Sequence, residues 1–408
     1  MGVPHGQGVA LVFEHTQVLG RVALALADDA TGALETGARF REAGLDARVI
    51  FEPDRKWSCD APVIDTETRH QSGVRARAVI REIGSRAREA GAGRVFKKTD
   101  STLRGPLAAE FSALFDVWPE LPLVYAPAYP ALGRSVRNGE LLVDGRPLNR
   151  TPFAADLLNP SRESSIAALL SETGAGIVVV RNPAELRAAL FPGGIFVCDG
   201  ETETDLEDVA EALRGAPCLV AGTAAMASVW ARSLWGGSVS SERRRVLRQS
   251  FAAATCLIVN GSLHPASRDQ LAASGIPMVT HNPAADPLEL GTQLAGSIAQ
   301  NRWAAVCASP APAAEPLAVA AHIARAAAHA IRLAAPECLM VFGGDTVFAI
   351  LRELDIDEAE PHFEMLPGAP VSTIAGQGTA RRMVLVTKAG GFGAPDYLVR
   401  IREILERA

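Results

Sequence analysis

The sequence is poor in aromatic residues, in cysteine and in long apolar runs. Phe, Trp and Tyr make up 5% of its 408 residues, and six residues are cysteine. No stretch approaches the roughly 18 uninterrupted apolar residues that a membrane-spanning helix needs, so we expect no membrane partner. The first 20 residues lack a basic segment followed by an apolar one, so we do not expect a signal peptide.

The six cysteines form no recognisable metal or disulfide pattern. No two stand close enough for a zinc knuckle, and most fall inside apolar, strand-like runs. We therefore expect buried free thiols in a protein located in the reducing cytoplasm. His264, His281 and His362 have no ligand partners at a useful spacing, which argues against a zinc site.

Length and charge narrow the class of protein further. A chain of 408 residues exceeds the usual size of one domain, and 48% hydrophobic residues suffice to give each of two domains a core. The net charge of −6 at pH 7 argues against nucleic acid as the main partner. A homodimer is compatible with the sequence, which does not fix the oligomeric state.

Short β-branched runs alternate with longer helical patterns, which predicts βαβ units and parallel sheet. Strands are predicted at 21–29, 46–52, 93–100, 122–128, 176–180, 194–200 and 217–222, and again at 255–261, 277–282, 303–309, 338–344 and 383–391. Helices are predicted at 31–43, 72–91 and 313–335. The Gly/Ser-rich and then charged segment 236–250 predicts a connection between the two series. We therefore predict an α/β fold of two domains, residues 20–235 and 250–408, each with a largely parallel sheet flanked by helices.

Two adjacent carboxylates follow the first predicted strand, and ligands in parallel α/β sheets bind beyond the carboxyl ends of strands. Asp28 and Asp29 end this strand, and Thr31-Gly32 then opens a helix. Such a pair can orient a hydroxyl, accept its proton or hold Mg²⁺. The structural alternative is a helix N-cap, but a cap needs only one Asp, so we expect a function for at least one of the two.

A second charged cluster lies in the stretch KKTDSTLRGP. Its polar members crowd around one turn, and they are Lys97, Lys98, Asp100, Ser101 and Arg104. Such a cluster can grip a carboxylate or a phosphate while the Asp handles a proton or a metal. The alternative is a solvated turn with an Asp–Ser cap, although ordinary turns rarely combine so much charge with a Gly-Pro stop.

The segment 125–151 has no clean periodicity but carries several arginines. Within it, VDGRPL predicts a hairpin turn. A lid, a substrate wall and a purely structural hairpin all fit this segment. The stretch DTETRH (65–70) adds one more cation, Arg69, which taken alone is usually a solvated side chain.

The second half contains three junctions in which a strand, glycine and a helix follow one another, at 259–271, 341–351 and 386–398. Glycine lets backbone N–H groups approach an anion, and the N-terminus of the next helix favours negative charge. Three such junctions, with Ser262, Thr346 and Lys388 beside them, suggest a cradle for nucleotide phosphates. Neither a P-loop nor a GxGxxG fingerprint occurs.

Six motifs in this order resemble the four-carbon acid sugar kinase family. They are ADDATGA, KKTDSTLRG, APAYPALGRSVRNGELLVDGRPLNRT, VNGSLHPASRDQ, FGGDT and TKAGGFG. The resemblance implies an acid-sugar domain and an ATP domain that close on each other, with the active site in the cleft between them. It places the sugar acid on Asp28, Asp29, Arg69, Lys98, Thr99, Asp100 and Ser101. It places ATP on Ser262, Gly343, Gly344, Asp345, Thr346, Gly390 and Gly391.

The resemblance also implies a reaction, in which the γ-phosphoryl group of ATP moves to the terminal hydroxyl of a threonate- or erythronate-like acid and forms its 4-phosphate. In this hypothesis Arg69 and Lys98, together with Arg104, anchor the substrate carboxylate. Asp29 or Asp100 orients the hydroxyl and takes its proton. Mg²⁺ bridges the phosphates, with Asp345 or an N-terminal-domain Asp nearby, but the metal ligands are not fixed by the sequence.

Three alternatives stay open. A non-catalytic, two-lobed protein that binds small hydroxy acids would use the N-terminal cluster without needing three glycine junctions. An NAD(P)-linked oxidoreductase would need a GxGxxG turn with an acidic residue roughly 20 positions later. The third alternative is a kinase of another sugar acid, such as 3-oxo-tetronate. The stretch DTETRH looks more like the threonate kinases, which favours a hydroxy acid, although Ala30 stands where family members often have Leu or Thr.

Overall fold

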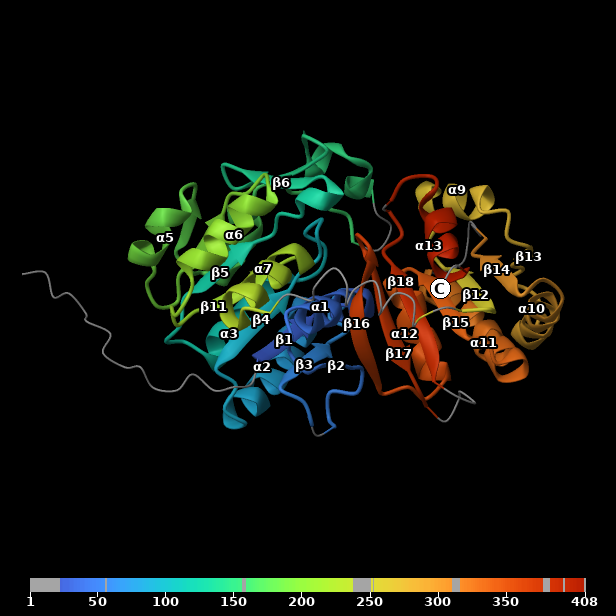
Figure 1. The fold of residues 1–408 in the computed structure, drawn as a ribbon. Helices are drawn as coiled ribbons and strands as arrows, with labels where there is room; N and C mark the ends of the chain where they lie inside the picture. The colour runs from blue at the N-terminus through green and yellow to red at the C-terminus, as the bar shows by residue number, and fades with distance from the viewer. Residues whose placement is uncertain are drawn as a thin grey trace, which may run out of the picture.

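The computed structural model describes residues 23–55, 57–155, 159–237, 251, 253–309, 316–376, 382–391 and 393–406. In it the chain forms two α/β halves that lie side by side, the N-terminal half in blue to green and the C-terminal half in yellow to red (Figure 1). Strands of both halves join one sheet with the order β13-β14-β12-β15-β18-β17-β16-β2-β3-β1-β4-β11-β5-β10-β9.

The strands that the N-terminal half gives to this sheet pair in parallel with one another. They are β1 (Ala23–Ala27), β2 (Ala47–Ile50), β3 (Ala61–Asp65), β4 (Arg94–Lys98), β5 (Leu123–Ala126), β9 (Ile177–Val180), β10 (Ile195–Cys198) and β11 (Leu219–Gly222). The helices are α1 (Ala30–Glu42), α2 (Gly73–Glu89), α3 (Leu107–Val117), α4 (Ile166–Leu170), α5 (Pro183–Ala189), α6 (Glu203–Ala212) and α7 (Ala224–Trp235). Every residue of β1 is buried, as expected for a strand covered by helices on both faces.

A small antiparallel sheet stands beside the N-terminal half. It consists of β6 (Arg134–Arg137), β7 (Glu140–Val143) and β8 (Arg146–Pro147). The turn between β7 and β8 has positive φ at both Asp144 and Gly145, which is the geometry of a tight hairpin. The hairpin predicted for VDGRPL is therefore confirmed. Short 3-10 helices occur at Pro130–Leu132, Leu148–Arg150, Pro152–Ala155 and Ser171–Thr173.

The C-terminal half combines a parallel core with an antiparallel hairpin. The parallel strands are β12 (Cys256–Asn260), β13 (Met278–Thr280), β14 (Trp303–Cys307), β15 (Cys338–Phe342) and β18 (Met383–Lys388). The hairpin strands are β16 (Glu358–Leu366) and β17 (Ala369–Ile374). The helices are α9 (Pro265–Ala273), α10 (Pro287–Asn301), α11 (Pro316–Ala334), α12 (Gly344–Glu353) and α13 (Tyr397–Glu406).

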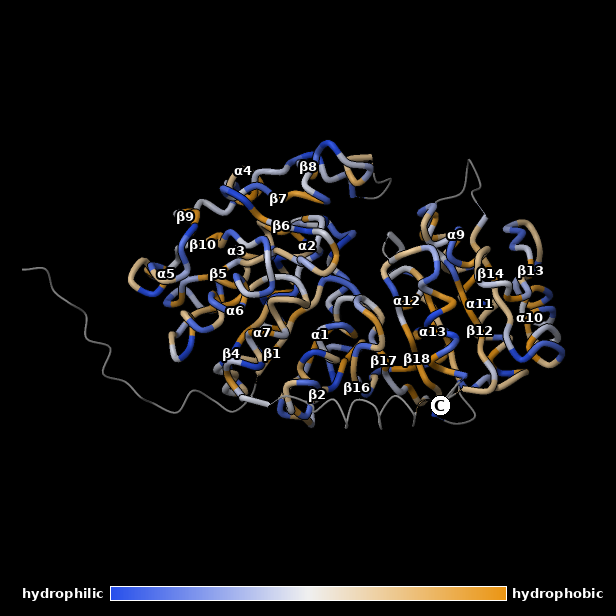
Figure 2. Tube along the Cα trace, turned by 45° about the horizontal axis from the view of Figure 1, so that its top comes forward, coloured by the Kyte–Doolittle hydropathy of each residue, from blue (hydrophilic) through white to orange (hydrophobic). Residues whose placement is uncertain are grey.

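The hairpin strand β16 joins the two halves, because it pairs antiparallel with β2 through Ala359 and Val49. Ion pairs reinforce the junction. One links Arg41 of α1 to Glu360 of β16 at 3.0 Å, and another links Arg39 of α1 to Glu364. Hydrophobic residues concentrate along the strands in both halves (Figure 2). They form two core clusters, one that spans both halves and a second within the C-terminal half.

The predicted α/β fold of largely parallel sheets is confirmed, and the predicted strands differ from the observed ones by a few residues at their ends. Three strands of the large sheet were not predicted, β3, β16 and β17. In β16 buried and less buried residues alternate, and the strand contains a proline and four acidic or histidine side chains, so it lacks the apolar run of a parallel strand. The predicted connection at 236–250 lies almost entirely outside the described residues.

The long apolar helix and the cysteines are both placed as in a folded protein core or at its edge. Helix α11 is long and apolar enough to cross a membrane, but half of its apolar window is buried and it packs between α10 and α12, as a core helix does. All six cysteines are free thiols, as expected. Three of them, Cys198, Cys256 and Cys338, are buried, and the other three are partly exposed.

Candidate functional site

The charged segments singled out in the N-terminal half meet at one edge of the sheet. Strand β1 lies between β3 and β4, and all three are parallel. The carboxylates of Asp28 and Asp29 follow β1, Arg69 lies in the loop after β3, and Asp100 and Arg104 lie in the loop after β4. Since the carboxyl ends of parallel strands share one edge, these side chains come within hydrogen-bonding distance of one another.

Arg69 is buried at the centre of this group and contacts three carboxylates. Its Nε donates to Asp28 Oδ2 at 2.7 Å, and a terminal nitrogen donates to Asp29 Oδ2. Its other terminal nitrogen lies 3.6 Å from Asp100 Oδ2. Burial alone would lower the pKa of this guanidinium, but Asp28, Asp29 and Asp100 raise it well above its usual value. Arg69 is therefore a fixed cation.

Asp100 is a strongly stabilised carboxylate. Arg104 donates to both of its oxygens, at 3.0 and 2.7 Å, and the backbone N–H of Thr102 donates to Oδ1 at 2.8 Å. Burial would raise the pKa of Asp100, but the charges of Arg104 and Arg69 hold it well below its usual range. A carboxylate of such low basicity is a poor acceptor for a substrate proton.

The two adjacent carboxylates have different environments. Asp29 is the N-cap of α1, since its Oδ1 accepts the N–H of Gly32 at 2.8 Å, and its side chain also reaches the ligand pockets described below. Asp28 is buried and faces Arg69. Burial would raise the pKa of Asp28, but Arg69 and Lys97 lower it. Asp29 is thus the helix cap that the structural alternative expected, and it also faces the pockets.

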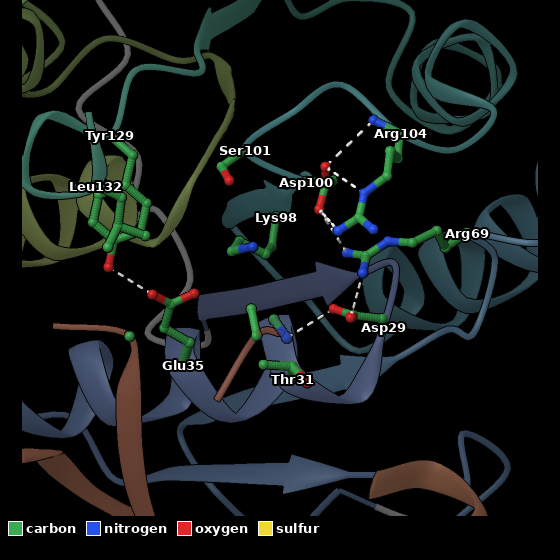
Figure 3. Close-up of a pocket in the computed structure, with 13 residues that line it drawn as sticks. Asp29, Thr31, Glu35, Arg69, Lys98, Asp100, Ser101, Arg104, Tyr129 and Leu132 are labelled. Carbon is green, nitrogen blue, oxygen red and sulfur yellow. Dashed lines mark hydrogen bonds and ion pairs between the residues drawn. The ribbon is translucent and has the colours of Figure 1, made fainter. Parts of the chain in front are cut away.

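A small polar pocket lies above the N-terminus of α1 (Figure 3). It contains about 450 Å³ of free space, including the part open to solvent, and its lining residues are Asp29, Thr31, Gly32, Glu35, Arg69, Lys98, Asp100, Ser101, Arg104, Tyr129, Leu132, Gly368 and Ala389. We call it the small pocket. Gly368 and Ala389 come from the C-terminal half, so both halves contribute to its wall.

Lys98 supplies a cation at the base of the small pocket. It is buried, its Nζ donates to the carbonyl of Thr99 at 3.0 Å, and a methyl group at Gly32 would come within 3.0 Å of Nζ. The ammonium therefore lies beside the positive end of the α1 dipole, an arrangement that favours an anion. Thr99 itself is fully buried, with its hydroxyl 3.3 Å from that of Tyr125, and is not among the residues lining the pocket.

A larger pocket adjoins the first. Its free space is about 1500 Å³, including the part open to solvent, and every residue that the resemblance placed on ATP lines it, namely Ser262, Gly343, Gly344, Asp345, Thr346, Gly390 and Gly391. We call it the large pocket. Asp29, Thr31, Arg69, Arg104 and Ala389 line both pockets, so these residues mark the junction between them.

The glycine junctions bring three turns into close contact in the large pocket. A methyl group at Gly390 would overlap Ser262 Oγ, and one at Gly261 would overlap Thr346 Oγ1. Helix α12 starts at Gly344 after Gly343, whose φ of 108° suits glycine, and no side chain of the described residues caps its N-terminus. The first N–H groups of α12 are therefore available to an anion.

A histidine not singled out from the sequence connects the halves at the large pocket. His70 Nε2 lies 2.7 Å from Asp345 Oδ1, and its Nδ1 lies 2.6 Å from Asn159 Nδ2. The hydrogen bond to Asp345 raises the pKa of His70. Only its position directly after Arg69 could have drawn attention to it.

Two further residues of the small pocket were also missed. Glu35 lies one helical turn after Thr31 on α1, so the helix that begins directly after the Asp pair places Thr31 and Glu35 on one face. Tyr129 comes from the loop after β5 and donates to Glu35 Oε1 at 2.6 Å. No local pattern marks Tyr129, because only the fold brings it against α1.

The fit of the site to a metal ion depends on its carboxylates. No group of three or more His, Cys, Asp or Glu side chains is arranged to hold one within the part of the chain that the structure describes. Two carboxylates line the large pocket, Asp29 and Asp345. Magnesium commonly uses only one or two protein carboxylates together with phosphate oxygens and water, so this pair fits an ion that arrives with a nucleotide.

Comparison with known protein families matches both halves of the chain. Residues 23–230 match the family model described as a sugar-binding N-terminal domain, and residues 257–398 match the one described as a nucleotide-binding C-terminal domain. The small pocket lies mainly in the first matched region and the large pocket mainly in the second.

Similar proteins of full length carry kinase names. A D-threonate kinase of Bordetella bronchiseptica is 30% identical over 93% of this chain and 96% of its own. A 3-oxo-tetronate kinase of Methylobacterium radiotolerans is 29% identical over 93% of this chain and 98% of its own. A solved Salmonella typhimurium structure, described as a putative tRNA synthase, has a TM-score of 0.75 at 21% identity over 94% of this chain and 99% of its own, which shows a shared fold alone. The chain belongs to the four-carbon acid sugar kinase family, and its relatives support a kinase of tetronate-type sugar acids.

Proposed function

We propose that this protein transfers the γ-phosphoryl group of ATP to the terminal hydroxyl of a four-carbon acid sugar of the threonate or erythronate type and forms its 4-phosphate. One observation carries the proposal. A small pocket rich in hydroxyl, carboxylate and cationic groups opens into a large pocket built from three glycine turns, and Asp29, Arg69 and Arg104 line both. Two substrates bound in these pockets would meet at those three residues.

ATP would occupy the large pocket. The uncapped N-terminus of α12 and the turns at Ser262 and Gly390 offer backbone N–H groups, which suit phosphates. Lys388 is buried beneath the last turn and donates to the carbonyls of Ala389 and Gly390 at 3.0 and 3.3 Å. It would hold this turn in place for the phosphates as a hydrogen-bond donor.

The acid sugar would occupy the small pocket with its carboxylate towards Lys98, Ser101 and the N-terminus of α1. This orientation places the terminal hydroxyl at the junction with the large pocket. It also changes the role of two cations that the sequence assigned to the carboxylate. Arg69 and Arg104 line both pockets, so we propose that they neutralise charge on the transferred phosphoryl group.

Asp29 is our candidate for the catalytic carboxylate. It lines both pockets, whereas Asp100 is held by Arg104 and Arg69 with its pKa well below the usual range. Asp29 would orient the terminal hydroxyl and accept its proton as the hydroxyl oxygen bonds to the γ-phosphorus and the bond to ADP breaks. Asp100 would position the two arginines.

Mg²⁺ would be held by the ATP phosphates and by Asp345 or Asp29, the carboxylates that line the large pocket. Bound there, it would neutralise phosphate charge. We also propose a cytoplasmic location, in line with six free cysteines. A homodimer stays a prediction.

An ADP-release screen tests the function directly. We expect turnover with D- or L-threonate or with D- or L-erythronate in the presence of ATP and Mg²⁺. Calorimetry with ATP alone should show binding, and a chain that binds the acid but not ATP would instead be a non-catalytic binding protein. Absence of turnover with every four-carbon acid, oxo acids included, would refute the four-carbon substrate.

A further inference from the structure

Glu35 places a carboxylate on the wall of the small pocket, apart from the charged groups at its junction with the large pocket. Its side chain is 9% exposed, and Figure 3 shows it with Tyr129 on one side of the pocket and Asp29, Arg69 and Arg104 on the other. An acidic side chain facing a pocket for an acid needs an explanation, because it repels the ligand's carboxylate.

One explanation would be an ion pair, but the nearby cations are engaged elsewhere. Arg39, one turn further along α1, pairs with Glu42 at 3.2 Å and with Glu364 across the domain junction. Lys98 donates to a backbone carbonyl, and Arg69 contacts three other carboxylates. Among the residues that the structure describes, no cation forms an ion pair with Glu35.

A single hydrogen bond fixes the orientation of Glu35. Tyr129, 3% exposed, donates its hydroxyl to Oε1 at 2.6 Å, and burial followed by the charge of Glu35 raises the pKa of this phenol well above its usual value. Tyr129 therefore stays a donor. Within the described parts of the chain, Oε2 of Glu35 has no hydrogen-bond partner, so it can accept from a ligand.

A carboxylate oxygen held in this way distinguishes between two kinds of ligand. It accepts a hydrogen bond from a hydroxyl, and it repels the lone pairs of a ketone oxygen. With the carboxylate of the acid at Lys98 and its terminal hydroxyl at Asp29, the two internal hydroxyls, at C2 and C3, remain to face the wall that carries Glu35. A 3-oxo acid keeps the hydroxyl at C2 but has a ketone at C3.

We propose that Glu35, oriented by Tyr129, is a specificity-determining residue that accepts a hydrogen bond from the C3 hydroxyl of the four-carbon acid and so favours hydroxy acids over their 3-oxo forms. This inference rests on the proposed function, since it concerns the acid-sugar site of the same kinase. It predicts which of the two substrate classes found among the relatives this chain prefers.

The experiment compares kcat/KM for D-threonate, D-erythronate and 3-oxo-tetronate in the wild type and in Glu35→Gln. The wild type should prefer one of the hydroxy acids. In Glu35→Gln, kcat/KM for that acid should fall about 10- to 100-fold, because a hydrogen bond to a charged group is lost. The value for 3-oxo-tetronate should stay constant or rise, since the amide can donate to the ketone.

Two further variants keep the test decisive. Tyr129→Phe should lower the preference in the same direction by a smaller factor, and it serves if Glu35→Gln does not fold. Glu42→Gln is the matched control on α1, because Glu42 is buried to a similar degree and lines neither pocket. Glu42→Gln should leave the ratio of the two substrate classes unchanged.

The outcomes separate this inference from the proposed function. If the wild type phosphorylates the acids but the ratio between hydroxy and 3-oxo substrates stays the same in Glu35→Gln and Tyr129→Phe, Glu35 has a structural role only and the inference is wrong. A wild type that prefers 3-oxo-tetronate overturns it as well. If no four-carbon acid is turned over, the proposed function itself fails, and this inference with it.

Discussion

The carboxylate of Asp29 lies against the backbone of Gly344, although the two residues belong to different halves of the chain. A methyl group at Gly344 would overlap Asp29 Oδ2. Asp29 is the N-cap of α1, and Gly344 is the first residue of α12, so the N-termini of two helices converge on one carboxylate. The proposed acceptor of the substrate proton thus lies at the turn proposed to hold the phosphates.

This contact predicts that Gly344→Ala lowers activity with little effect on folding. The added methyl group would push Asp29 and α12 apart, and displacements of about 1 Å in a reacting group can cost roughly 10²-fold in rate. The measurement is kcat/KM for the acid together with the melting temperature. Gly296→Ala is the matched control, because a methyl group in its place on α10 meets no atom within 4 Å. Equal activities of the two variants would show that the approach of Asp29 to Gly344 is unimportant.

The assignment of the base predicts different effects for the two candidate carboxylates. Asp29→Asn should lower kcat by about 10²–10⁴-fold, the usual cost of losing a general base. Asp100→Asn should weaken the positions of Arg69 and Arg104 and lower kcat less. Single-turnover kinetics on both variants, with ATP affinity as a check of folding, make the comparison. A normal kcat in both variants would refute the roles proposed for Asp29 and for Asp100. A larger loss in Asp100→Asn would make Asp100 the base and Asp29 the positioning residue.

The parts of the site that could be predicted from the sequence follow strands directly. Asp29 comes just after β1, Lys98 is the last residue of β4, and Arg104 lies in the turn that follows β4. Because the carboxyl ends of parallel strands meet at one edge, strand positions alone brought these residues together. The same reasoning located the turns that begin with Ser262 and Gly343.

The remainder depends on contacts between segments distant in the sequence. Tyr129 reaches Glu35 across 94 residues, and His70 reaches Asp345 across 275. Neither Tyr129 nor His70 is marked by a local sequence pattern, because a lone tyrosine or histidine in a loop is usually structural. Strand β16 was not predicted either, because it alternates buried and less buried residues instead of forming an apolar run. Without β16, the joining of the two sheets into one could not be predicted.

Lys388 predicts a stability that depends on pH. Burial lowers its pKa to about 7 from 10.5, and within the described residues it has no carboxylate partner. Between these pH values the unfolded chain binds a proton that the folded chain does not, so this group's contribution to stability rises with pH and its burial cost is greatest below pH 7. Lys388→Met should therefore raise the free energy of unfolding at pH 6 by roughly 3–5 kcal/mol, and the gain should disappear towards pH 10.5.

A second buried lysine provides the contrast. Lys97 lies 3.0 Å from Glu110, so Lys97→Met leaves a buried carboxylate unpaired and should destabilise the fold by about 3–5 kcal/mol. Urea unfolding at pH 6 and pH 10 measures both variants. Lys388→Met should also weaken ATP binding, since it removes the donor beneath the turn at Gly390. Destabilisation by Lys388→Met at pH 6 would show that the lysine is not strained by burial.

The pair of His70 and Asp345, which links the two halves, predicts a contribution to stability that falls as pH rises, opposite to that of Lys388. The hydrogen bond to Asp345 raises the pKa of His70 above 6.5, while burial and the charge of Arg69 oppose the rise. A group with a raised pKa contributes its full stability below its unfolded value and loses it as pH rises through the folded value. His70→Gln should therefore lower the melting temperature more at pH 6 than at pH 9. Both side chains are partly exposed, so we expect a shift of only a few degrees.

Asp345→Asn should remove the same pH dependence, and the double variant should add nothing further at pH 6. Fully additive effects would mean that the two side chains do not act as a pair in solution.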